Sequence, residues 1–450
     1  MRRETTAAQE VGARRETLDA SEARHEIRDV RRVSSLSSRN LVSRLTSHAT
    51  APWPKVRLGD VGRVVTGLTP PTKHSEYFGD RFLFVTPSDL RYDSYYIANS
   101  ERKISDDGYT KFSTRFIPAG SVMYTCIASI GKVGISRSEV LTNQQINSIV
   151  PNVDTDCRFL YYLLRHLTPN IQQQNAGCAV PIINKGDFES FQIPLPPLPV
   201  QRRIADILSA YDDLIENNRR RIAILEETAR LTYRKWFGGS GAKGGMRHET
   251  IDELHVSRLT SHAQLRTVTL GEICREVRRG VNPDAIAPDT PYIGLEHMPR
   301  RSISLCEWES AQKVTSTKLS FEAGDILFGK IRPYFHKVGI AFVDGVASSD
   351  AIVIKPNRPE LLAYVLMTVS SDAFVAAASQ GMKEGSKMPR ADWKQLLRYC
   401  VVLPDAETLS AFNKVLNPIL AQLKALCFSS RTLAAARDML LPRLFTHQTN

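Results

Sequence analysis

Residues 116–135, FIPAGSVMYTCIASIGKVGI, are similar to a later segment of the chain, residues 321–340, FEAGDILFGKIRPYFHKVGI. Further along, NSIVPN (147–152) matches IVIKPN (352–357) at the same offset of 205 residues. Self-similarity at a fixed distance is the sequence signature of a repeated architecture. This duplication therefore decides the fold that we expect.

The match continues on the N-terminal side of these segments. VRLGDVGRVVTG (56–67) corresponds to VTLGEICREVRRG (268–280). The octapeptide VSRLTSHA occurs identically at 42–49 and 256–263. We infer two repeated blocks in the 450-residue chain, which is long enough for several domains with their own cores.

Each repeat begins with mixed secondary-structure signals. Short apolar runs such as RFLFVTPSDL (81–90) and SVMYTCIASI (121–130) are bounded by Gly, Pro and Asn, which is typical of strands. CRFLYYLLRHL (157–167) and its counterpart ELLAYVLMTV (360–369) have helix-like patterns. The mixture predicts a duplicated α+β domain.

Each repeat ends in a long stretch with apolar residues at alternating spacings of four and three. Such a heptad pattern, present twice in the same register, predicts two long helices that pack on each other as a coiled coil. The first stretch has no Gly or Pro between residues 201 and 237, whereas Pro418 should kink the second helix or delay its start. The predicted seam positions are Ile204, Leu208, Tyr211, Ile215, Asn218, Ile222, Leu225, Ala229, Thr232 and Trp236, then Phe412, Leu416, Ile419, Leu423, Leu426, Ser430, Leu433, Arg437, Leu440 and Leu444.

PLPPLPVQRRIADIL (194–208) precedes the first long helix and has two interpretations. In isolation it could be a polyproline ligand for a partner domain, because it has PxxP spacing with Arg202 nearby. Inside a duplicated protein, Pro199 suits the first turn of a helix because its φ is already set. The helix start is the favoured interpretation.

The composition favours a polyanionic partner. Apolar residues make up 42% and charged residues 24%, typical of a soluble globular protein, but the net charge is +12. A positive excess of this size indicates nucleic acid first and an acidic membrane surface second. The seven cysteines have no CxxC spacing, which argues against a disulfide framework or a zinc site and suits a reducing cytoplasm. Neither a membrane-spanning run nor a secretory signal is expected.

Motifs of catalysis are scarce. The chain has no GxxxxGK[ST] and no GxGxxG, and SIGKVG (129–134) reads as a turn between strands. A nuclease-like Asp…Glu-x-Lys spacing occurs at Asp89, Glu101 and Lys103, but the second repeat lacks it. A Mg-dependent nuclease is thus a minor alternative, and a duplicated recognition module is the main hypothesis.

Three segments are similar to conserved regions of one known family. IPLPPLPVQRRIADIL with the helix that follows resembles the central region of the specificity subunits of type I restriction–modification systems. IPAGSVMYTCIASIGKVGIS resembles the core of their target recognition domain, and SRTLAAARDMLLPRLF their closing region. The resemblance covers residues 52–445; the family commonly has Glu where this chain has Val200.

The resemblance implies a non-catalytic subunit. It implies two target recognition domains that each bind half of a bipartite double-stranded DNA target, and an antiparallel coiled-coil spacer with pseudo-two-fold symmetry. It also implies two docked methyltransferase subunits, further restriction subunits, and S-adenosylmethionine, ATP and Mg on those partners rather than on this chain. A related bipartite system, whose methylation and cleavage activities share one partner chain, is the runner-up.

On this basis the domain boundaries that we expect follow the repeats. They are a disordered basic tail at 1–51, recognition domain 1 at 52–196, spacer helix 1 at 197–237, a flexible linker at 238–263, recognition domain 2 at 264–403 and spacer helix 2 at 404–445.

DNA binding needs Lys and Arg for phosphates and polar side chains for base edges. For Asn143 and Gln144 a turn-satisfying amide is an equally good interpretation, and for each single Arg or Lys so is an ordinary surface charge. The first-domain candidates are Thr69, Lys73, Arg91, Tyr92, Asn143, Gln144 and Gln145, with Lys132 and Lys185 as phosphate contacts. The second-domain candidates are Arg278, Arg279, His297, Arg300, Arg301, Lys330, Arg332, Lys337, Lys383, Lys387 and Arg390.

The first long helix also carries residues outside its seam. Arg219 and Arg220 could be solvated, bind the methyltransferase subunit or follow DNA between the half-sites. Leu231, Tyr233 and Phe237 are apolar residues that suit a partner helix. Core packing is the competing interpretation of the three apolar residues.

Overall fold

The computed structural model describes two compact units. The described residues are 53–92, 94–174, 181–238, 266–380 and 388–446. Unit 1 comprises the described residues of Met1–Leu214 and Leu433–Asn450, and unit 2 comprises those of Ile215–Thr432. The expected tail at 1–51, the linker at 238–263 apart from Gly238, and both copies of VSRLTSHA lie outside the described residues.

Unit 1 is built on a five-stranded sheet. The strand order is β2-β10-β7-β8-β5, antiparallel except for the parallel pair β5 and β8. The strands are β2 (Gly62–Thr66), β10 (Ile146–Pro151), β7 (Val122–Thr125), β8 (Val133–Ser136) and β5 (Tyr96–Ile97). Beside it lie a four-stranded sheet of β3 (Phe78–Gly79), β6 (Arg102–Ile104), β4 (Phe82–Val85) and β9 (Val140–Thr142), and the pair β1 (Lys55–Arg57) and β11 (Gln192–Pro194). Its shorter helices are α2 (Asp106–Phe112), α3 (Cys157–Gln174) and α4 (Lys185–Ser190).

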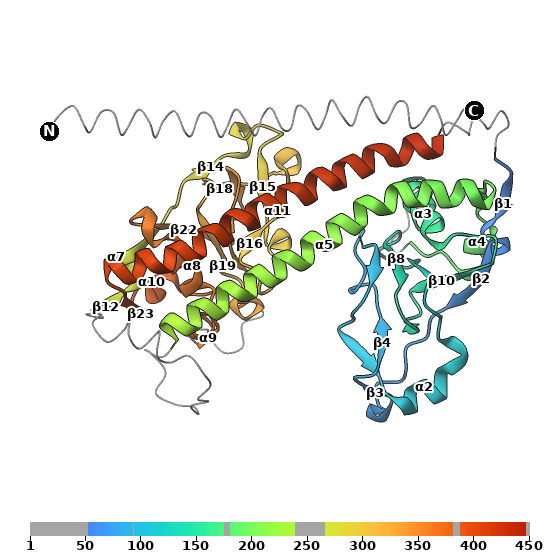
Figure 1. Cartoon of the computed structure of the whole chain (residues 1–450), viewed down its shortest axis with the longest axis horizontal. Helices are drawn as coiled ribbons and strands as arrows, with labels where there is room; N and C mark the ends of the chain where they lie inside the picture. The colour runs from blue at the N-terminus through green and yellow to red at the C-terminus, as the bar shows by residue number, and fades with distance from the viewer. Residues whose placement is uncertain (1–52, 93, 175–180, 239–265, 381–387, 447–450) are drawn as a thin grey trace. The chain divides into compact units, whose positions relative to one another are not determined.

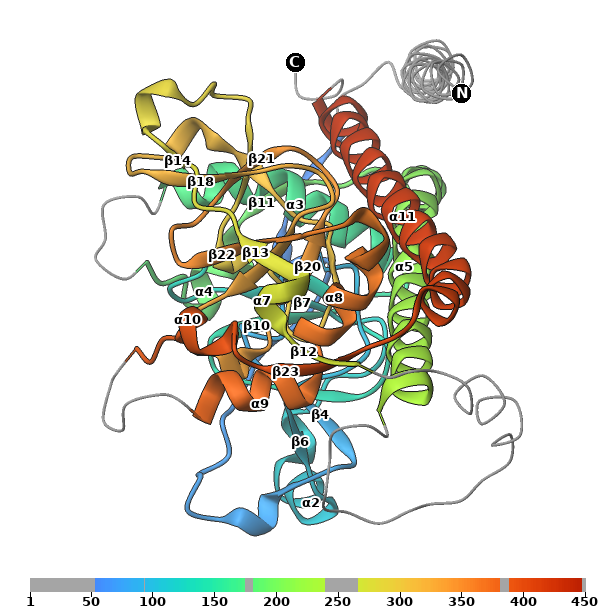
Figure 2. The ribbon, with the colours of Figure 1, turned by 90° about the vertical axis from the view of Figure 1, so that its left-hand side faces the viewer.

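Unit 2 repeats the five-stranded sheet of unit 1 strand by strand. Its order β13-β22-β19-β20-β16 has the same pairing senses, again with only the last pair parallel, and Figure 2 shows β13, β22 and β20 next to helix α8. These strands are β13 (Cys274–Glu276), β22 (Ala351–Pro356), β19 (Ile326–Gly329), β20 (Val338–Ala341) and β16 (Ser304–Leu305). The second sheet has β14 (Gly280–Val281), β18 (Lys318–Phe321), β21 (Gly345–Ala347), β15 (Pro291–Ile293) and β17 (Glu309–Ser310), and β12 (Arg266–Thr269) pairs with β23 (Cys400–Leu403). The helices are α7 (Leu270–Ile273), α8 (Leu362–Val369), α9 (Asp372–Gln380) and α10 (Trp393–Leu396).

Two long helices, α5 (Leu198–Phe237) and α11 (Ala406–Thr446), each contribute to both units (Figure 1). In unit 1, Leu208 of α5 shares a core with Leu444 near the end of α11. In unit 2, Trp236 near the end of α5 packs on Phe412 near the start of α11, with ring centres 5.8 Å apart. The helices are therefore antiparallel, and none of the predicted seam residues is exposed. The predicted fold class is confirmed.

The start of α5 explains the proline-rich stretch. The helix begins at Leu198, so Pro199 lies in its first turn, where a missing N–H costs no helical hydrogen bond. Gln201 is buried, donates to the Pro196 carbonyl (2.8 Å) and accepts from the Asp156 N–H (2.9 Å). This amide ties the first turn to the loop before α3. In α11, by contrast, the helix begins at Ala406, so the expected delay to a start after Pro418 is wrong.

A charged cluster is buried where α5, α11 and α3 meet in unit 1. Asp212 of α5 pairs with Arg437 of α11, and both side chains are almost fully buried. The Tyr162 hydroxyl of α3 donates to the second Asp212 oxygen (2.5 Å), and Arg437 also pairs with Asp438 (2.9 Å). Burial raises the pKa of Asp212, and Arg437 and Tyr162 oppose this shift. Charged groups at this depth are tolerated because each of them is ion-paired or hydrogen-bonded to another member of the cluster.

One cysteine pair departs from the expectation of free thiols. Cys306 and Cys427 form a disulfide, with their Cα atoms 5.0 Å apart. The bond links the segment after β16 to α11 within unit 2. Cys126, Cys157, Cys274 and Cys400 are free, and Cys178 lies outside the described residues.

No single helix within the described residues is long and apolar enough to cross a membrane. The bent pair Pro359–Val369 and Asp372–Gln380 meets that criterion only when both helices are taken together, and most side chains of α8 are buried in unit 2.

We predict that Arg437→Met destabilises unit 1 by about 3–5 kcal/mol, because it strands the buried Asp212 carboxylate. The double variant Asp212→Asn/Arg437→Met removes both charges and keeps an acceptor for Tyr162, so it should recover most of the loss. Thermal or urea unfolding measures both effects. Arg81→Ala, which breaks an exposed ion pair with Asp106, is the control and should cost under about 1 kcal/mol. A double variant no more stable than Arg437→Met alone would contradict this account.

Candidate nucleic-acid interface

Each unit carries a loop with an unusual backbone after the third strand of its five-stranded sheet. We call residues 126–131 and 330–336 the left-handed loops. Ala128 (φ 62°) and Gly131 (φ 98°) in unit 1 correspond to Arg332 (φ 47°) and His336 (φ 53°) in unit 2. A positive φ costs a residue with a side chain about 1–2 kcal/mol and tends to occur at functional sites. The left-handed loops are therefore the candidate site.

The two loops are also anchored in the same way. In unit 1, the Ala128 N–H donates to the Pro181 carbonyl (3.1 Å), and the Ile183 N–H donates to the Cys126 carbonyl (2.9 Å). In unit 2, the corresponding bonds run from Arg332 to Pro389 (2.8 Å) and from Ala391 to Lys330 (2.8 Å). Each loop is thus held by a short segment about fifty residues further along the chain.

The unit 2 loop gathers basic residues that are far apart in the sequence. The Arg300 guanidinium lies over the Phe335 ring, 4.2 Å from its centre, and the Tyr334 side chain is 51% exposed beside it. Arginine interleaved with aromatic rings is a common arrangement for binding phosphates and stacking on bases. The predicted contacts that meet here are Lys330, Arg332, Lys337, Arg300 and Arg390.

Two of the predicted phosphate contacts have an internal role. Lys132 in unit 1 and Lys337 in unit 2 occupy the same position of the repeat. The Lys132 ammonium donates to the Pro87 carbonyl (2.7 Å), and the Lys337 ammonium donates to the Leu295 carbonyl (2.5 Å). Burial lowers the pKa of both groups, and a neighbouring arginine adds to the shift. Each lysine therefore ties its loop to the turn after β4 or β15.

Asp89 and His297 close those same turns. The Asp89 carboxylate accepts the Thr86 N–H (2.8 Å), and the His297 ring accepts the Gly294 N–H (2.9 Å). His297 is buried, so little of its ring is available to DNA. The other Asp89 oxygen accepts the Glu101 N–H (2.8 Å), so both oxygens of the carboxylate already bind backbone amides. These contacts give the nuclease-like spacing a structural explanation.

A pocket opens between this turn and the strand end that carries Asn143 in unit 1. Asn143 and Gln145 bond to each other, with the Asn143 amide donating to the Gln145 carbonyl oxygen (3.1 Å). Thr69 donates to the side-chain carbonyl of Gln144, which joins two predicted contacts from distant segments. The pocket has a volume of about 310 Å³ and is lined by Thr86, Pro87, Ser88, Asp89, Glu101, Arg102, Asn143 and Gln145. The turn-satisfying interpretation describes Asn143, whereas Gln144 is exposed.

The other predicted contacts lie on the surface. Several take part in exposed ion pairs, which contribute little to stability and leave the cation accessible. The pairs are Lys185 with Glu189, Arg278 with Glu276, Arg279 with Glu322 and Arg301 with Asp372. Lys73, Arg91 and Tyr92 are exposed, whereas Lys383 and Lys387 lie outside the described residues.

The predicted partner residues on α5 divide into two groups. Leu231 is 54% exposed, Arg219 is exposed, and Arg220 pairs with Glu216 (3.3 Å). Tyr233 and Phe237 pack on the core of unit 2, where the Phe237 ring centre lies 5.0 Å from that of Phe412. Core packing therefore describes Tyr233 and Phe237.

Sequence reasoning missed Tyr334 and the buried carboxylate of Glu226, whose contacts within unit 2 are described below. For Tyr334 a signal was present in KIRPYFH (330–336), where three aromatic residues follow Lys330 and Arg332. For Glu226 no signal existed, because a Glu near the middle of a charged helix looks solvated. Among the described residues, no group of three or more His, Cys, Asp or Glu side chains is placed to hold a metal ion.

Comparison with known proteins gives a consistent set of relatives. Residues 51–227 match the family described as the type I restriction modification DNA specificity domain. The specificity subunit of the type I restriction enzyme MjaIX from Methanocaldococcus jannaschii is 34% identical over 188 residues, which are 41% of this chain and 44% of that protein. The HindI specificity subunit from Haemophilus influenzae is 30% identical over 175 residues, 37% and 38% of the two chains. The chain spans less than half the length of these curated relatives.

One solved structure has the same fold. The S subunit of a type I restriction-modification system from M. genitalium aligns with a TM-score of 0.53 at 15% identity, over 88% of this chain and 97% of that one. The likeness extends over both units.

We predict that Gly131→Ala destabilises unit 1 much more than Gly120→Ala. Both glycines have positive φ, so both substitutions incur the backbone cost of about 1–2 kcal/mol. At Gly131 a Cβ would also collide with the Thr168 side chain, whereas nothing lies within 4 Å at Gly120. Thermal unfolding compares the two variants, and equal losses would show that the loop does not pack on α3 as described.

Proposed function

We propose that this chain is the DNA-specificity subunit of a type I restriction–modification complex, because residues 51–227 match the family described as the type I restriction modification DNA specificity domain. It binds a bipartite double-stranded DNA target, one half-site to each unit. The observation that carries the proposal is the duplicated left-handed loop, which has two residues of positive φ and the same backbone anchoring in both units.

Recognition rests on two kinds of contact. Exposed cations such as Lys73 and Arg300 neutralise phosphates and position the duplex, without reading its sequence. Side chains at the left-handed loops and near the unit 1 pocket, such as Gln144, read base edges by hydrogen bonding. Because these side chains differ between the two units, the two half-sites differ in sequence.

The long helices act as spacer and docking surface. A helix rises about 1.5 Å per residue, and an antiparallel pair is stiff, so we expect a fixed number of undetermined base pairs between the half-sites. Two methyltransferase subunits and the restriction subunits dock on the chain, with Arg219, Arg220 and Leu231 as contacts for the former. The exposed Leu231 side chain supports this assignment because it lies outside the helix seam.

Chemistry belongs to the partners in this proposal. The chain catalyses nothing; S-adenosylmethionine, ATP and Mg are bound by the methyltransferase and restriction subunits. Like its DNA target and its partners, the complex resides in the cytoplasm. A recognition subunit of a related bipartite system, with methylation and cleavage in one partner chain, would have the same recognition domains and a different docking partner.

Methylome sequencing of the source organism, with and without the gene, tests the proposal. We predict that deletion abolishes one split N6-adenine methylation motif, and that a plasmid copy of the gene restores it. An unchanged methylome would contradict an active specificity role. Purified chain incubated with Mg and DNA is the companion experiment, because cleavage without partner subunits would favour the nuclease alternative.

A matched pair of lysine variants separates phosphate contacts from internal ties. We predict that Lys73→Ala weakens binding to all DNA sequences and reduces the slope of log affinity against log salt by about 1. Lys132→Met should leave the slope unchanged and lower the unfolding temperature, because it removes the donor to the Pro87 carbonyl. Fluorescence anisotropy at several salt concentrations measures the slopes. A reduced slope for Lys132→Met would show that this lysine contacts phosphate after all.

A further inference from the structure

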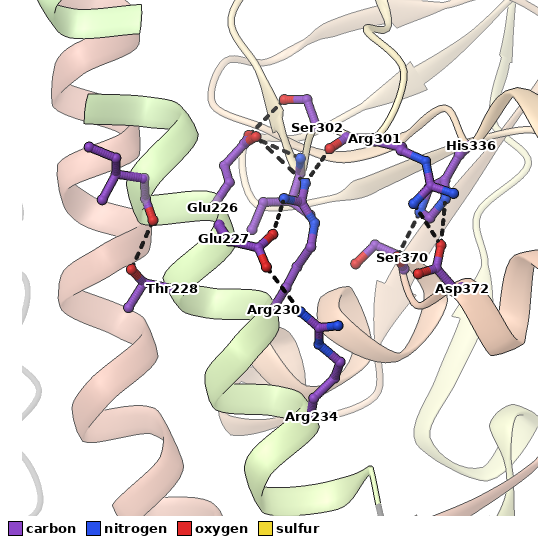
Figure 3. A network of polar contacts seen from close by, with 12 residues as sticks. Glu226, Glu227, Thr228, Arg230, Arg234, Arg301, Ser302, His336, Ser370 and Asp372 are labelled. Atoms are coloured by element: carbon purple, nitrogen blue, oxygen red, sulfur yellow. Dashed lines mark hydrogen bonds and ion pairs between the residues drawn. The ribbon is translucent and has the colours of Figure 1, made fainter. Parts of the chain in front are cut away.

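A buried glutamate of the long helix α5 holds the edge strand of unit 2. Glu226 is 5% exposed, and one of its carboxylate oxygens accepts from the Ser302 hydroxyl (2.6 Å) and from the N–H groups of Ile303 and Ser304, both at 3.0 Å (Figure 3). The Ser304 hydroxyl donates to the same oxygen. A single carboxylate thus satisfies the donors at the start of β16.

The loss of this acceptor would be costly. Ile303 and Ser304 are each 1% exposed, so water could not replace the carboxylate without a rearrangement of the strand. A buried N–H without an acceptor costs about 1–3 kcal/mol. The contact therefore determines where β16 lies on α5.

β16 transmits this position to the left-handed loop of unit 2. It pairs in parallel with β20, with Ser304 opposite Ile340, and the Ile340 N–H donates to the Ile303 carbonyl (2.8 Å). β20 begins at Val338, two residues after the loop ends at His336.

A second route runs through Arg230, one turn further along α5. Its guanidinium donates to the Arg301 carbonyl and pairs with Glu227 (3.4 Å). Arg301 itself has a left-handed backbone (φ 57°), and its N–H donates to the His336 carbonyl (2.9 Å). Two bonds thus connect the helix to the last residue of the loop, and Figure 3 shows the first of them, between Arg230 and Arg301.

The His336 side chain also holds the end of the loop, through a hydrogen bond to the backbone of Ser370. Its ring is buried, and its Nε2 lies 2.7 Å from the Ser370 carbonyl, so Nε2 carries the hydrogen and donates. Burial lowers the pKa of His336, with Arg301 and Arg230 adding to the shift and Asp372 opposing it.

In unit 1 the corresponding loop is held by the helix α3. The Gln172 amide of α3 donates to the Ile130 carbonyl (2.7 Å), and Gly131 lies against Thr168. In unit 2 the part of α5 that belongs to this unit holds the loop instead, through Glu226 and Arg230.

We propose that Glu226 and Arg230 are positioning residues for the second half-site: they hold the left-handed loop of unit 2 on α5 and so determine how well it reads its bases. The inference rests on the proposed function and goes beyond it, because neither residue touches DNA. Arg230 acts through a backbone carbonyl, and Glu226 acts through two backbone N–H groups together with the hydroxyls of Ser302 and Ser304.

The test uses the chain in complex with its methyltransferase subunits. Two DNA libraries are bound, one with the first half-site randomised and the other with the second half-site randomised. The variants are Glu226→Ala, Glu226→Gln and Arg230→Met, with Asp213→Ala, an exposed acid on the same helix, as the control.

We expect Glu226→Ala and Arg230→Met to reduce discrimination at the second half-site by about tenfold or more, equivalent to about 1.4 kcal/mol, with the first half-site unchanged. Glu226→Gln keeps an acceptor oxygen in place and should restore most of the discrimination. Equal losses at both half-sites, or full discrimination in Glu226→Ala and Arg230→Met, would overturn the inference. Thermal unfolding of the same complexes identifies variants that fail to fold: if Glu226→Ala unfolds, Arg230→Met and Glu226→Gln decide between the two outcomes.

Arg301→Gly separates positioning from direct contact. It preserves the left-handed backbone and both backbone bonds of residue 301, and it removes the side chain together with its ion pair to Asp372. Any phosphate contact of this candidate cation would be lost too, which lowers affinity for all sequences alike. We therefore expect second-half-site discrimination, measured as the ratio of affinities, to be kept, and a loss of discrimination as large as that of Arg230→Met would contradict the backbone route. If the wild-type complex shows no preference for either half-site, the proposed function fails; if it shows both and Glu226→Ala retains both, only the inference fails.

Discussion

The structure depends on one constraint: both long helices contribute buried residues to the core of each unit. The unit 1 core includes Leu208 of α5 and Leu444 of α11 together with the buried face of α3. The unit 2 core includes Ala229 of α5 and Phe412 of α11 together with α8. Hydrophobic burial therefore fixes α5 and α11 to the rest of each unit.

Polar contacts make this shared packing specific. In unit 1 the buried Asp212 and Arg437 pair the two helices with each other, and Tyr162 of α3 donates to Asp212. In unit 2 the buried Glu226 carboxylate accepts from backbone N–H groups at the start of β16. Such groups are costly when misaligned because each then lacks a partner in a region that water cannot reach. They favour one arrangement of strand and helix where apolar packing alone would tolerate several.

The duplication shows which features of the loop belong to the scaffold. Lys132 and Lys337, and likewise Asp89 and His297, make corresponding contacts in both units although the side chains of the second pair differ. What differs is the exposed surface: Tyr334 and the ring-stacked Arg300 in unit 2 have no close chemical counterpart in the CIASIG loop of unit 1. With such a scaffold, the exposed side chains of the loop can vary while its backbone stays in position.

The sequence by itself determined the duplication, the α+β class and two long helices with matching apolar seams, whereas their antiparallel direction was expected only from the family resemblance. Heptad spacing, repeat offsets and proline positions are local or periodic properties, and they predict which residues face a partner without knowledge of the fold. Even the buried Arg437 was visible as a seam position. The partner that neutralises it was not, because ion pairing across helices depends on their relative stagger.

Only the tertiary structure decided which candidate residues act together. It places Arg300, Lys330 and Arg390 at one loop and buries His297 in a turn. It also pairs Cys306 with Cys427 in a disulfide. It also revealed the left-handed backbone of Ala128 and Arg332, which no residue type announces. These outcomes depend on long-range strand pairing and burial, because a charge or a thiol gains its role from neighbours that lie far away in the sequence.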